Sequence, residues 1–506
     1  MPSTLLKSLL AVASCVLFQL SFATPAPTDA SASNNGGAGV PGLPAKIYGV
    51  NLGSWLLIEP WMLPAEWVAM GGEQCDDCSA CIRSEFALAQ AYPDTVDATL
   101  KKHWQTWFSQ SDVNAIKAAG INTVRIPLGY WIIEPLVNRK TEFYARGGIV
   151  ELVRGLSQLK AAGIKVILDH HALPGVASPN QMFAGKCTTD VQFYTDYNYH
   201  RALVWTAVMT ALSHLHPEFS SVVSIQAINE PIMDATQTPS LGNFYKNFVQ
   251  TIRAVELSLG IPIQGSGFDV PNLKINSDSG SLFNADTIAS LNATGALSKG
   301  ATSLREIFTP EVISVLEETV PTLLQVATQL KMNLAVGALG SYWERRQPLI
   351  ANMMDVNWQY NSPSNPADAA IGPQAYDNHL YYSFGGVADP NEEAYLTHLC
   401  NLNRIETDAA VGNSPLWFGE WSLATQFNAT DEFLFKWADA QKLQYSKGAG
   451  WLFWNWKIEI SGLAGDTARQ WSYQEALRRG YFSQNPTELH DPNVCVPYIK
   501  SPTVVQ

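Results

Sequence analysis

The distribution of apolar and polar residues along the chain predicts strands that alternate with helices. Short apolar runs rich in β-branched residues are typical of buried strands, and longer stretches with apolar residues at helical spacing separate most of them. The predicted strands cover 46–52, 121–128, 164–168, 222–229, 333–338, 375–382, 416–421 and 450–457. The predicted helices cover 111–119, 148–162, 200–215, 244–259, 310–330, 392–404, 431–443 and 473–479.

Eight strands separated mainly by helices favour a parallel sheet with right-handed crossovers. The simplest closure is a (β/α)8 TIM barrel, an α/β fold, with loop insertions. A doubly wound open sheet is the alternative, but no glycine-rich phosphate loop opens a predicted helix. We interpret 261–300, rich in Gly, Ser, Asn and Asp, as an insertion and expect 345–373 to be irregular.

The N-terminal segment is typical of a secretory signal. Lys7 precedes an apolar run from Leu9 to Phe22, and a small-residue cleavage pattern ends at Ala23. This run is too short and too close to the start to favour a membrane anchor. We therefore expect a signal peptide over 1–23, a disordered leader over 24–45 and one catalytic domain over 46–506.

Composition narrows the classes of partner. The chain is 46% hydrophobic and 15% charged, which allows a large core and excludes global disorder. The net charge of −13 argues against nucleic acid and anionic membrane as partners, since both favour a basic surface. The 16 Trp and 18 Tyr either belong to the core or line a sugar-binding cleft.

Six of the seven cysteines remain after the predicted signal peptide, which contains Cys15. An even number in an exported chain predicts disulfides, with fifteen possible pairings. The candidates are Cys75, Cys78, Cys81, Cys187, Cys400 and Cys495. The first three resemble a metal knuckle, but no histidine follows at ligand spacing, so we predict no metal site. Sequons at Asn292 and Asn428 predict N-glycosylation.

Two carboxylates lie at the ends of predicted apolar strands, where a charged side chain indicates a functional role. Asn229, Glu230 and Pro231 end one strand, because proline cannot continue a central strand, and Glu420 ends another. In a barrel both ends meet at one mouth. A facing pair fits glycosidic hydrolysis: one carboxyl protonates the leaving oxygen, and the other attacks the anomeric carbon or activates water.

Further polar and aromatic residues gather at the same strand ends. They can bind sugar hydroxyls or orient the carboxylates, although a lone histidine at a strand end is more often structural. Trp454 and Trp456 offer a face for a pyranose ring or belong to the core. The remaining candidates are Arg125, His171, His379 and Tyr381.

The motifs together resemble fungal members of glycoside hydrolase family 5, close to the secreted exo-β-1,3-glucanase group. They occur in family order between residue 46 and about residue 480. The matching stretches are Gly49-Val50-Asn51-Leu52-Gly53-Ser54-Trp55 with Glu59-Pro60, Val124-Arg125-Ile126-Pro127, Asp169-His170-His171-Ala172-Leu173-Pro174-Gly175, Ile228-Asn229-Glu230-Pro231, His379-Leu380-Tyr381 and Phe418-Gly419-Glu420-Trp421-Ser422.

The resemblance implies a retaining mechanism with Glu230 as acid/base and Glu420 as nucleophile, their carboxyl groups roughly 5–5.5 Å apart. It implies that Glu59 binds a sugar hydroxyl and that one tryptophan, preferably Trp456, forms the sugar platform. The other residues expected to support the glycone are Arg125, His171, Asn229, His379 and Tyr381, with Phe183 and Phe384 as an entrance clamp.

The implied protein is a monomeric enzyme, secreted to the extracellular space or cell wall, that hydrolyses fungal β-glucan without a metal or organic cofactor. The implied action is that of an exo-acting glucan 1,3-β-glucosidase. The doubled His170-His171, the cysteine-rich loop and the 261–300 insertion depart from the group's pattern. Endo-β-1,6-glucanase and β-glucan transglycosylase therefore stay open. A glucan-binding wall protein is the alternative that is not an enzyme, and the presence of both carboxylates disfavours it.

Overall fold

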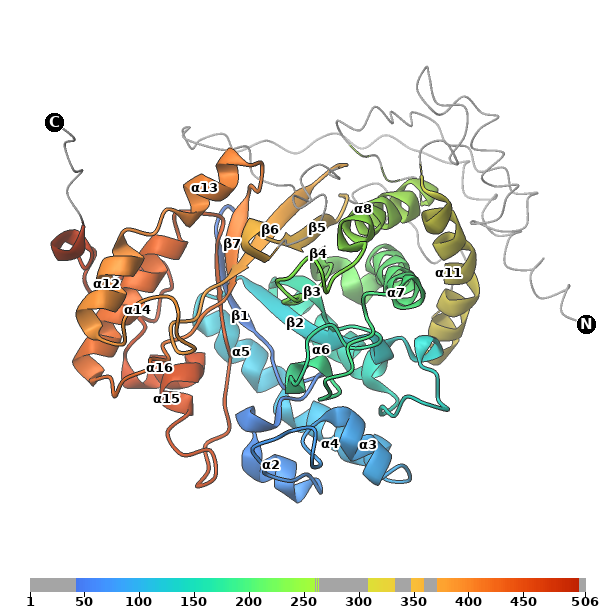
Figure 1. The fold of residues 1–506 in the computed structure, drawn as a ribbon, viewed down its shortest axis with the longest axis horizontal. Helices are drawn as coiled ribbons and strands as arrows, with labels where there is room; N and C mark the ends of the chain where they lie inside the picture. The colour runs from blue at the N-terminus through green and yellow to red at the C-terminus, as the bar shows by residue number, and fades with distance from the viewer. Residues whose placement is uncertain are drawn as a thin grey trace, which may run out of the picture.

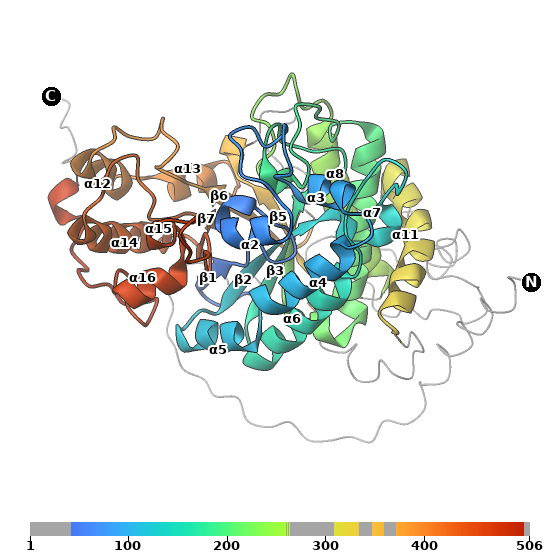
Figure 2. The same cartoon turned by 90° about the horizontal axis from the view of Figure 1, so that it is seen from below.

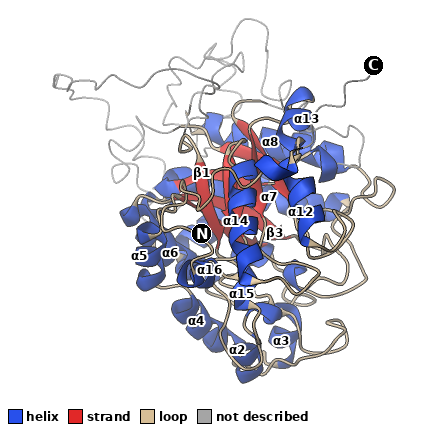
Figure 3. Ribbon diagram, turned by 90° about the vertical axis from the view of Figure 1, so that its left-hand side faces the viewer, coloured by secondary structure: helices blue, strands red, loops and turns tan. Residues whose placement is uncertain are grey.

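The computed structural model describes residues 42–259, 261, 263, 308–332, 347–358 and 371–499. Within them, parallel strands close a barrel in chain order from β1 to β8, with helices around it (Figures 1 and 3). The strands are β1 (Ile47–Asn51), β2 (Thr123–Gly129), β3 (Lys165–Ala172), β4 (Val222–Gln226), β5 (Ile350–Met354), β6 (Gln374–His379), β7 (Leu416–Glu420) and β8 (Gly450–Phe453). The predicted (β/α)8 barrel is confirmed.

The predicted helices that alternate with these strands are present in the structure. They are α5 (Gln110–Ala118), α6 (Gly148–Ala162), α7 (Asp196–Leu215), α8 (Leu241–Ser258), α11 (Pro310–Gln329), α12 (Glu392–Cys400), α14 (Asp431–Tyr445) and α16 (Tyr473–Arg479). The shorter helices α2 (Pro64–Ala69), α3 (Glu85–Ala91), α4 (Val96–Trp107), α13 (Arg404–Ala410) and α15 (Ala468–Trp471) were not predicted separately. Figures 1 and 2 show α2, α3 and α4 grouped together, and they follow the carboxyl end of β1.

The fifth strand corrects the sequence-based assignment. The predicted strand over 333–338 lies outside the described residues, and the segment expected to be irregular contains β5. This strand pairs with β4 and β6 and closes the barrel. Its sequence, Ile-Ala-Asn-Met-Met, has a single β-branched residue and an internal Asn, so it carries a weak strand signal. The signal peptide, the 261–300 insertion apart from two of its residues, and Asn292 also lie outside the described residues.

The barrel interior is apolar near the strand starts and polar toward the strand ends. The fully buried apolar group is Ile47, Ile167, Ile350, Ala375, Trp417 and Leu452. Because side chains alternate along a strand, Asp169 and His171 share the inner face of β3 with Ile167. His170 faces outward and stacks on Trp205 of α7, with ring centroids 3.9 Å apart. Burial lowers the pKa of His170 to about 3, so this histidine is a neutral packing residue.

Disulfides pair all six candidate cysteines. The bonds are Cys75–Cys81, Cys78–Cys187 and Cys400–Cys495. The disulfide prediction is confirmed. Cys75, Cys78 and Cys81, which resemble a metal knuckle, are all disulfide-bonded, so their sulfurs are not free to bind a metal. Stable disulfides are typical of an oxidising compartment.

Two further features bear on export. Across the described ranges, none of the helices combines the length and the apolar character that a membrane crossing requires. Asn428 is exposed in the loop before α14, and the Oγ of Thr430 in the same sequon caps that helix by accepting from the Phe433 amide. Glycosylation at Asn428 stays a prediction, and its side chain is accessible.

Candidate active site

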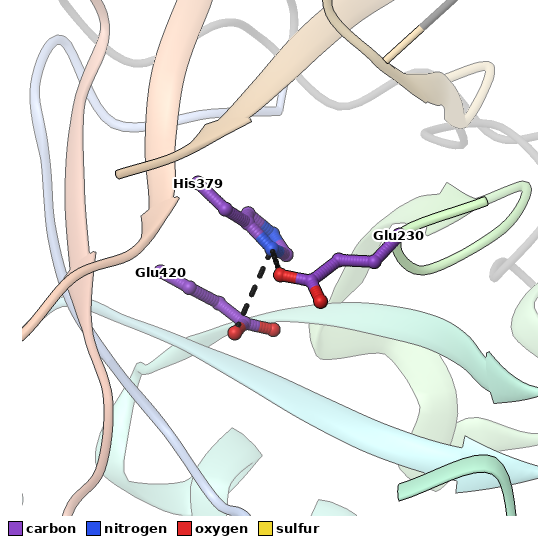
Figure 4. A group of neighbouring side chains, drawn as sticks. All are labelled: Glu230, His379 and Glu420. Carbon is purple, nitrogen blue, oxygen red and sulfur yellow. Dashed lines mark hydrogen bonds and ion pairs between the residues drawn. The ribbon is translucent and has the colours of Figure 1, made fainter. Parts of the chain in front are cut away.

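Glu230, His379 and Glu420 converge at the carboxyl ends of β4, β6 and β7 (Figure 4). One side-chain oxygen or nitrogen atom of each residue lies within 4.8 Å of the others. His379 Nδ1 is 2.7 Å from Glu230 Oε1 and 3.6 Å from Glu420 Oε2. This spacing fits the roughly 5–5.5 Å between the carboxyl groups of retaining glycosidases better than the wider gap, about 6.5–9.5 Å, of inverting ones.

Glu230 has an unusual backbone conformation. Its φ of 41° is in the left-handed region, which costs a residue with a side chain roughly 1–2 kcal/mol. Ser178 Oγ donates a hydrogen bond to the Glu230 carbonyl oxygen at 2.8 Å. The strand itself ends at Gln226, three residues before the end of the predicted strand 222–229, so Glu230 lies in the segment that follows β4. Strained residues of this kind cluster at active sites, where the surrounding structure holds a side chain in place.

Glu420 accepts hydrogen bonds at both carboxylate oxygens. Arg125 Nη1 donates to Oε1 at 2.7 Å, and the Tyr381 hydroxyl donates to Oε2 at 2.9 Å. The preceding residue, Gly419, has no room for a side chain, since a Cβ there would lie 2.0 Å from an oxygen of Asp377. The Gly419 amide donates to that same carboxylate at 2.7 Å. Glycine at position 419 thus lets β6 and β7 pack closely just before Glu420, the last residue of β7.

Arg125 is the buried cation at the centre of the polar layer. Its guanidinium also donates to the side-chain oxygens of Asn51, Gln226 and Asn229. It forms ion pairs with Asp169 at 3.0 Å and Asp377 at 3.8 Å. Burial lowers the pKa of Arg125, but the surrounding carboxylates outweigh burial and raise it, so Arg125 stays charged. Asn229 is therefore held by Arg125, beside Glu230.

His379 is a second cation in the site. Burial lowers its pKa, but the charges of Glu420 and Asp377 outweigh burial and raise the pKa to about 10. Burial also raises the pKa of Glu230, yet the hydrogen bond and charge of His379 hold that pKa below its usual range. Burial raises the pKa of Glu420 despite His379 and Arg125. At neutral pH, the site without sugar therefore keeps a proton on His379, next to Glu230.

Glu59 adds a third carboxyl group. It follows β1 in the chain, is 6% exposed and accepts from Trp61 Nε1 at 2.9 Å through Oε2. Its Oε1 is buried and has no hydrogen-bond partner among the described residues. Burial raises the pKa of Glu59 to about 7, and the charges of Glu420 and Glu230 add to this rise. The free oxygen is an unused acceptor beside the carboxylate pair.

His171 and Trp454 form another part of the site. His171 Nδ1 lies 2.6 Å from Asp169 Oδ2, and its ring stacks near that of Trp454, with centroids 5.7 Å apart. The Phe183 ring meets His171 edge-on at 5.5 Å. The two histidines of the doubled pair therefore have different surroundings, and His171 is the one in the site.

The position of Trp456 corrects the preferred sugar platform. Its indole Nε1 donates to Asp112 of α5 at 3.2 Å, and its ring stacks on Tyr473 of α16. Trp456 is thus packed among outer helices, whereas Trp454 contacts His171. The preference for Trp456 came from the family resemblance, and the predicted strand 450–457 placed both tryptophans on one face, but β8 ends at Phe453. Beyond that point alternation no longer decides which side a residue faces.

Aromatic residues that sequence reasoning missed lie next to Tyr381. The Trp471 ring lies 5.5 Å from Tyr381, 5.2 Å from Trp61 and 6.2 Å from Phe384. Phe384 is 77% exposed, so this group, Trp61, Tyr381, Phe384 and Trp471, reaches solvent and is called the aromatic rim below. Trp61 and Trp471 lie in irregular or short elements, where periodicity predicts no facing direction.

A (β/α)8 barrel with a close carboxylate pair at the ends of β4 and β7 defines a retaining glycoside hydrolase. The family model described as cellulase, glycosyl hydrolase family 5, matches residues 93–459, and the chain belongs to this family.

Named relatives place the chain among fungal sequences. It is 29% identical over 467 residues to glucan endo-1,6-beta-glucosidase B of Emericella nidulans, covering 90% of this chain and 89% of the relative. It is 26% identical over 456 residues to a probable glucan 1,3-beta-glucosidase A of Aspergillus niger, covering 89% of this chain and 90% of the relative. The crystal structure of rutinosidase from Aspergillus niger superposes with a TM-score of 0.53 at 17% identity, over 87% of this chain and 98% of that one. This last likeness shows a shared fold.

Proposed function

We propose that this protein is a retaining β-glucanase that cleaves within β-1,6-linked glucan. The observation that supports hydrolysis is the Glu230–Glu420 pair with His379 between them. The relative named as an endo-1,6-beta-glucosidase, 29% identical over 90% of this chain, supports the linkage and the endo action. Exo-acting cleavage of β-1,3-glucan, the expectation from the motifs, is the second candidate and is favoured by the relative at 26% identity.

The first step forms a glycosyl-enzyme. A Glu420 oxygen attacks the anomeric carbon, and the bond from that carbon to the leaving oxygen breaks. Glu230 gives a proton to the leaving oxygen, so no free alkoxide forms. Arg125 and Tyr381 favour the ionised form of Glu420 and orient it by their hydrogen bonds at 2.7 and 2.9 Å. The proton that Glu230 needs is available from His379 Nδ1, 2.7 Å away.

The second step releases the sugar. Glu230, now a carboxylate, takes a proton from water as the water oxygen bonds to the anomeric carbon and the ester to Glu420 breaks. Two displacements at one carbon restore its configuration. An acceptor sugar in place of water gives transglycosylation by the same two steps, so the ratio of the products separates the two outcomes.

Sugar recognition follows from the groups around the pair. We assign the platform for the glycone ring to Trp454 and a hydroxyl contact to the free Oε1 of Glu59. Asn229 and His171 are the further polar contacts, and Phe183 lines the entrance beside His171. Aromatic faces suit the apolar faces of pyranose rings, so the rim of Trp61, Tyr381, Phe384 and Trp471 suits glucosyl units further along the chain.

The protein is proposed to act outside the cell. Disulfides and the N-terminal pattern support secretion through signal peptide 1–23, with the 24–45 leader and a single catalytic domain over 46–506. We propose glycosylation at Asn292 and Asn428 and a monomer that acts on polymeric glucan. The two-carboxylate chemistry requires no cofactor.

A substrate panel with product sizing tests the proposal. Pustulan, a β-1,6-glucan, should yield oligosaccharides of mixed length at early times, and laminarin, a β-1,3-glucan, should react more slowly. Glucose as the sole early product from laminarin would move the assignment to the exo-β-1,3 candidate. Binding of either polymer without hydrolysis by the wild-type protein would refute the enzyme and favour a glucan-binding wall protein.

A further inference from the structure

We propose that the Cys78–Cys187 disulfide is a positioning element for sugar binding, an inference that rests on the proposed function. It joins two loops, here called loop 70–84, between α2 and α3, and loop 173–195, between β3 and α7. Loop 173–195 directly follows β3, and loop 70–84 belongs to the connection from β1 to β2. The bond thereby connects segments 109 residues apart in sequence at one side of the active site.

Loop 173–195 contacts two groups of the active site. Ser178 Oγ donates to the Glu230 carbonyl at 2.8 Å, and Phe183 packs edge-on against His171 at 5.5 Å. Tyr194 ties the start of this loop to the segment after Glu230. Its hydroxyl donates to the Ala177 carbonyl at 2.9 Å and accepts from the Ile232 amide at 2.8 Å. The part with Ser178 is therefore held independently of the disulfide.

The outer part of the loop, residues 180–188, depends more on its neighbour. Asn180 has a φ of 56°, a left-handed conformation that asparagine adopts more readily than other residues with a side chain. Within the loop, its amide donates to the Thr188 carbonyl at 2.8 Å. Contacts to the α3 side are the Phe86 amide bond to the Gly185 carbonyl and a cation–π contact of Lys186 with Phe86. Residues 180–188 carry Phe183, so these contacts and the disulfide control where Phe183 lies.

Loop 70–84 is a firm base for this connection. The buried Trp67 donates through Nε1 to the Ile82 carbonyl at 3.0 Å, and its own carbonyl accepts from the Gly72 amide at 2.9 Å. At the end of the loop, Glu85 Oε1 accepts from the Ile58 amide at 2.7 Å. Ile58 precedes the sugar-binding candidate Glu59. The disulfide thus links the wall that contains Phe183 to the segment that positions Glu59.

Loss of the disulfide should weaken sugar binding more than it slows the chemical step. Glu230, His379 and Glu420 are positioned by β4, β6 and β7 and by hydrogen bonds within the barrel. Without the disulfide, residues 180–188 gain freedom, and Phe183 must be ordered again each time sugar binds. We expect KM for a soluble β-1,6-gluco-oligosaccharide to rise about 3- to 10-fold, with kcat within about 2-fold of wild type.

The chain offers matched controls. Cys400–Cys495 closes 95 residues, nearly the same length, and joins α12 to the segment before the 3-10 helix Val496–Tyr498. It lies on a different side of the barrel from α3 (Figures 1 and 2). Because stabilisation by cross-linking varies with the logarithm of loop length, the two bonds should stabilise the fold by similar amounts. Cys75–Cys81 lies within loop 70–84 but does not reach loop 173–195.

The experiment compares three double variants, C78S/C187S, C400S/C495S and C75S/C81S, each assayed well below its own melting temperature. The inference predicts a raised KM in C78S/C187S, with wild-type KM in the other two. The same KM change in C78S/C187S and C400S/C495S would overturn it, as would a loss confined to kcat. If C78S/C187S does not fold, Phe183→Ala and partial reduction of the folded wild type, with the reduced cysteines mapped by mass spectrometry, make the same comparison.

Failure of the proposed function gives a different result. A wild-type protein that cleaves none of the β-1,6-, β-1,3- and β-1,4-glucans refutes the β-glucanase assignment. In that case we measure Kd by calorimetry for those oligosaccharides of the three glucans that the wild-type protein binds. This measurement tests the positioning role without any turnover. A Kd equal in wild type and C78S/C187S overturns the role of the disulfide, and wild type that binds none of them overturns both proposals.

Discussion

Removing the Tyr381 hydroxyl isolates one hydrogen bond of the proposed nucleophile. In Tyr381→Phe the ring keeps its packing against Trp471 and Phe384, and Glu420 Oε2 loses a donor at 2.9 Å. A hydrogen bond to a charged group contributes about 1.5–3 kcal/mol. Glu420 is 5% exposed, so water replaces the lost donor poorly. With tenfold in rate for each 1.36 kcal/mol, kcat should fall roughly 10- to 150-fold.

The same substitution should change the pH profile in a defined direction. Burial already raises the pKa of Glu420, and loss of a donor to the ionised form raises it further. The acidic limb of the profile of kcat/KM on pustulan oligosaccharides should therefore move to higher pH. Tyr382→Phe is the matched control, because its hydroxyl pairs with His398 at 2.8 Å and not with a carboxylate. Activity of Tyr381→Phe within about twofold of wild type, with an unmoved acidic limb, would refute this account of Glu420.

Three further predictions concern other groups. Burial raises the pKa of Glu85 from 4.5 to about 8, so its protonated form favours folding below pH 4.5 and this contribution is lost as pH rises through 8. Glu85→Gln, which keeps an acceptor for the Ile58 amide, should melt at a higher temperature than wild type at pH 8 but not at pH 4; parallel melting curves would contradict this. Trp454→Ala should raise KM at least several-fold. Trp456→Ala should leave KM unchanged and lower the melting temperature, because the free energy of unfolding falls by about 3–5 kcal/mol. The reverse pattern would restore Trp456 as the platform. Glu59, with a pKa of about 7, gains charge beside the carboxylate pair as pH rises, so kcat/KM of wild type should fall above pH 7 more steeply than that of Glu59→Gln, and superimposable profiles would contradict its place in the site.

The main features of the fold and site could be predicted because the local signals were strong. Strands with β-branched runs and helices with apolar periodicity were recognisable. Glu420 ends the apolar strand β7, and Glu230 follows the apolar strand β4 by four residues. The convergence of these two carboxylates follows from parallel strands ending at one mouth. The split of His170 and His171 between two faces follows from alternation within β3, which the structure shows continuing through both residues.

The errors arose where local patterns lose their meaning. β5 has a weak strand signal, and tertiary pairing with β4 and β6 determines its conformation. Trp454 and Trp456 are two residues apart, so alternation would place both on one face and could not choose the platform residue; β8 ends at Phe453, and contacts with other elements separate the two rings. Disulfide pairing depends on distances between remote segments, as Cys78–Cys187 illustrates. The raised pKa of Glu59 and the aromatic contacts of Trp471 depend on burial and on neighbours from other elements.

Trapping the glycosyl-enzyme tests the central claim most directly. A 2-deoxy-2-fluoro-β-glucosyl fluoride, or its gentiobiosyl form, slows release of the covalent sugar, and peptide mass spectrometry locates the label. The site contains three carboxyl groups, Glu59, Glu230 and Glu420, so the labelled residue distinguishes between their roles. The account predicts one label per chain, on Glu420, and no label in Glu420→Gln. A label on Glu230 or Glu59, or inactivation without a covalent sugar, would contradict it.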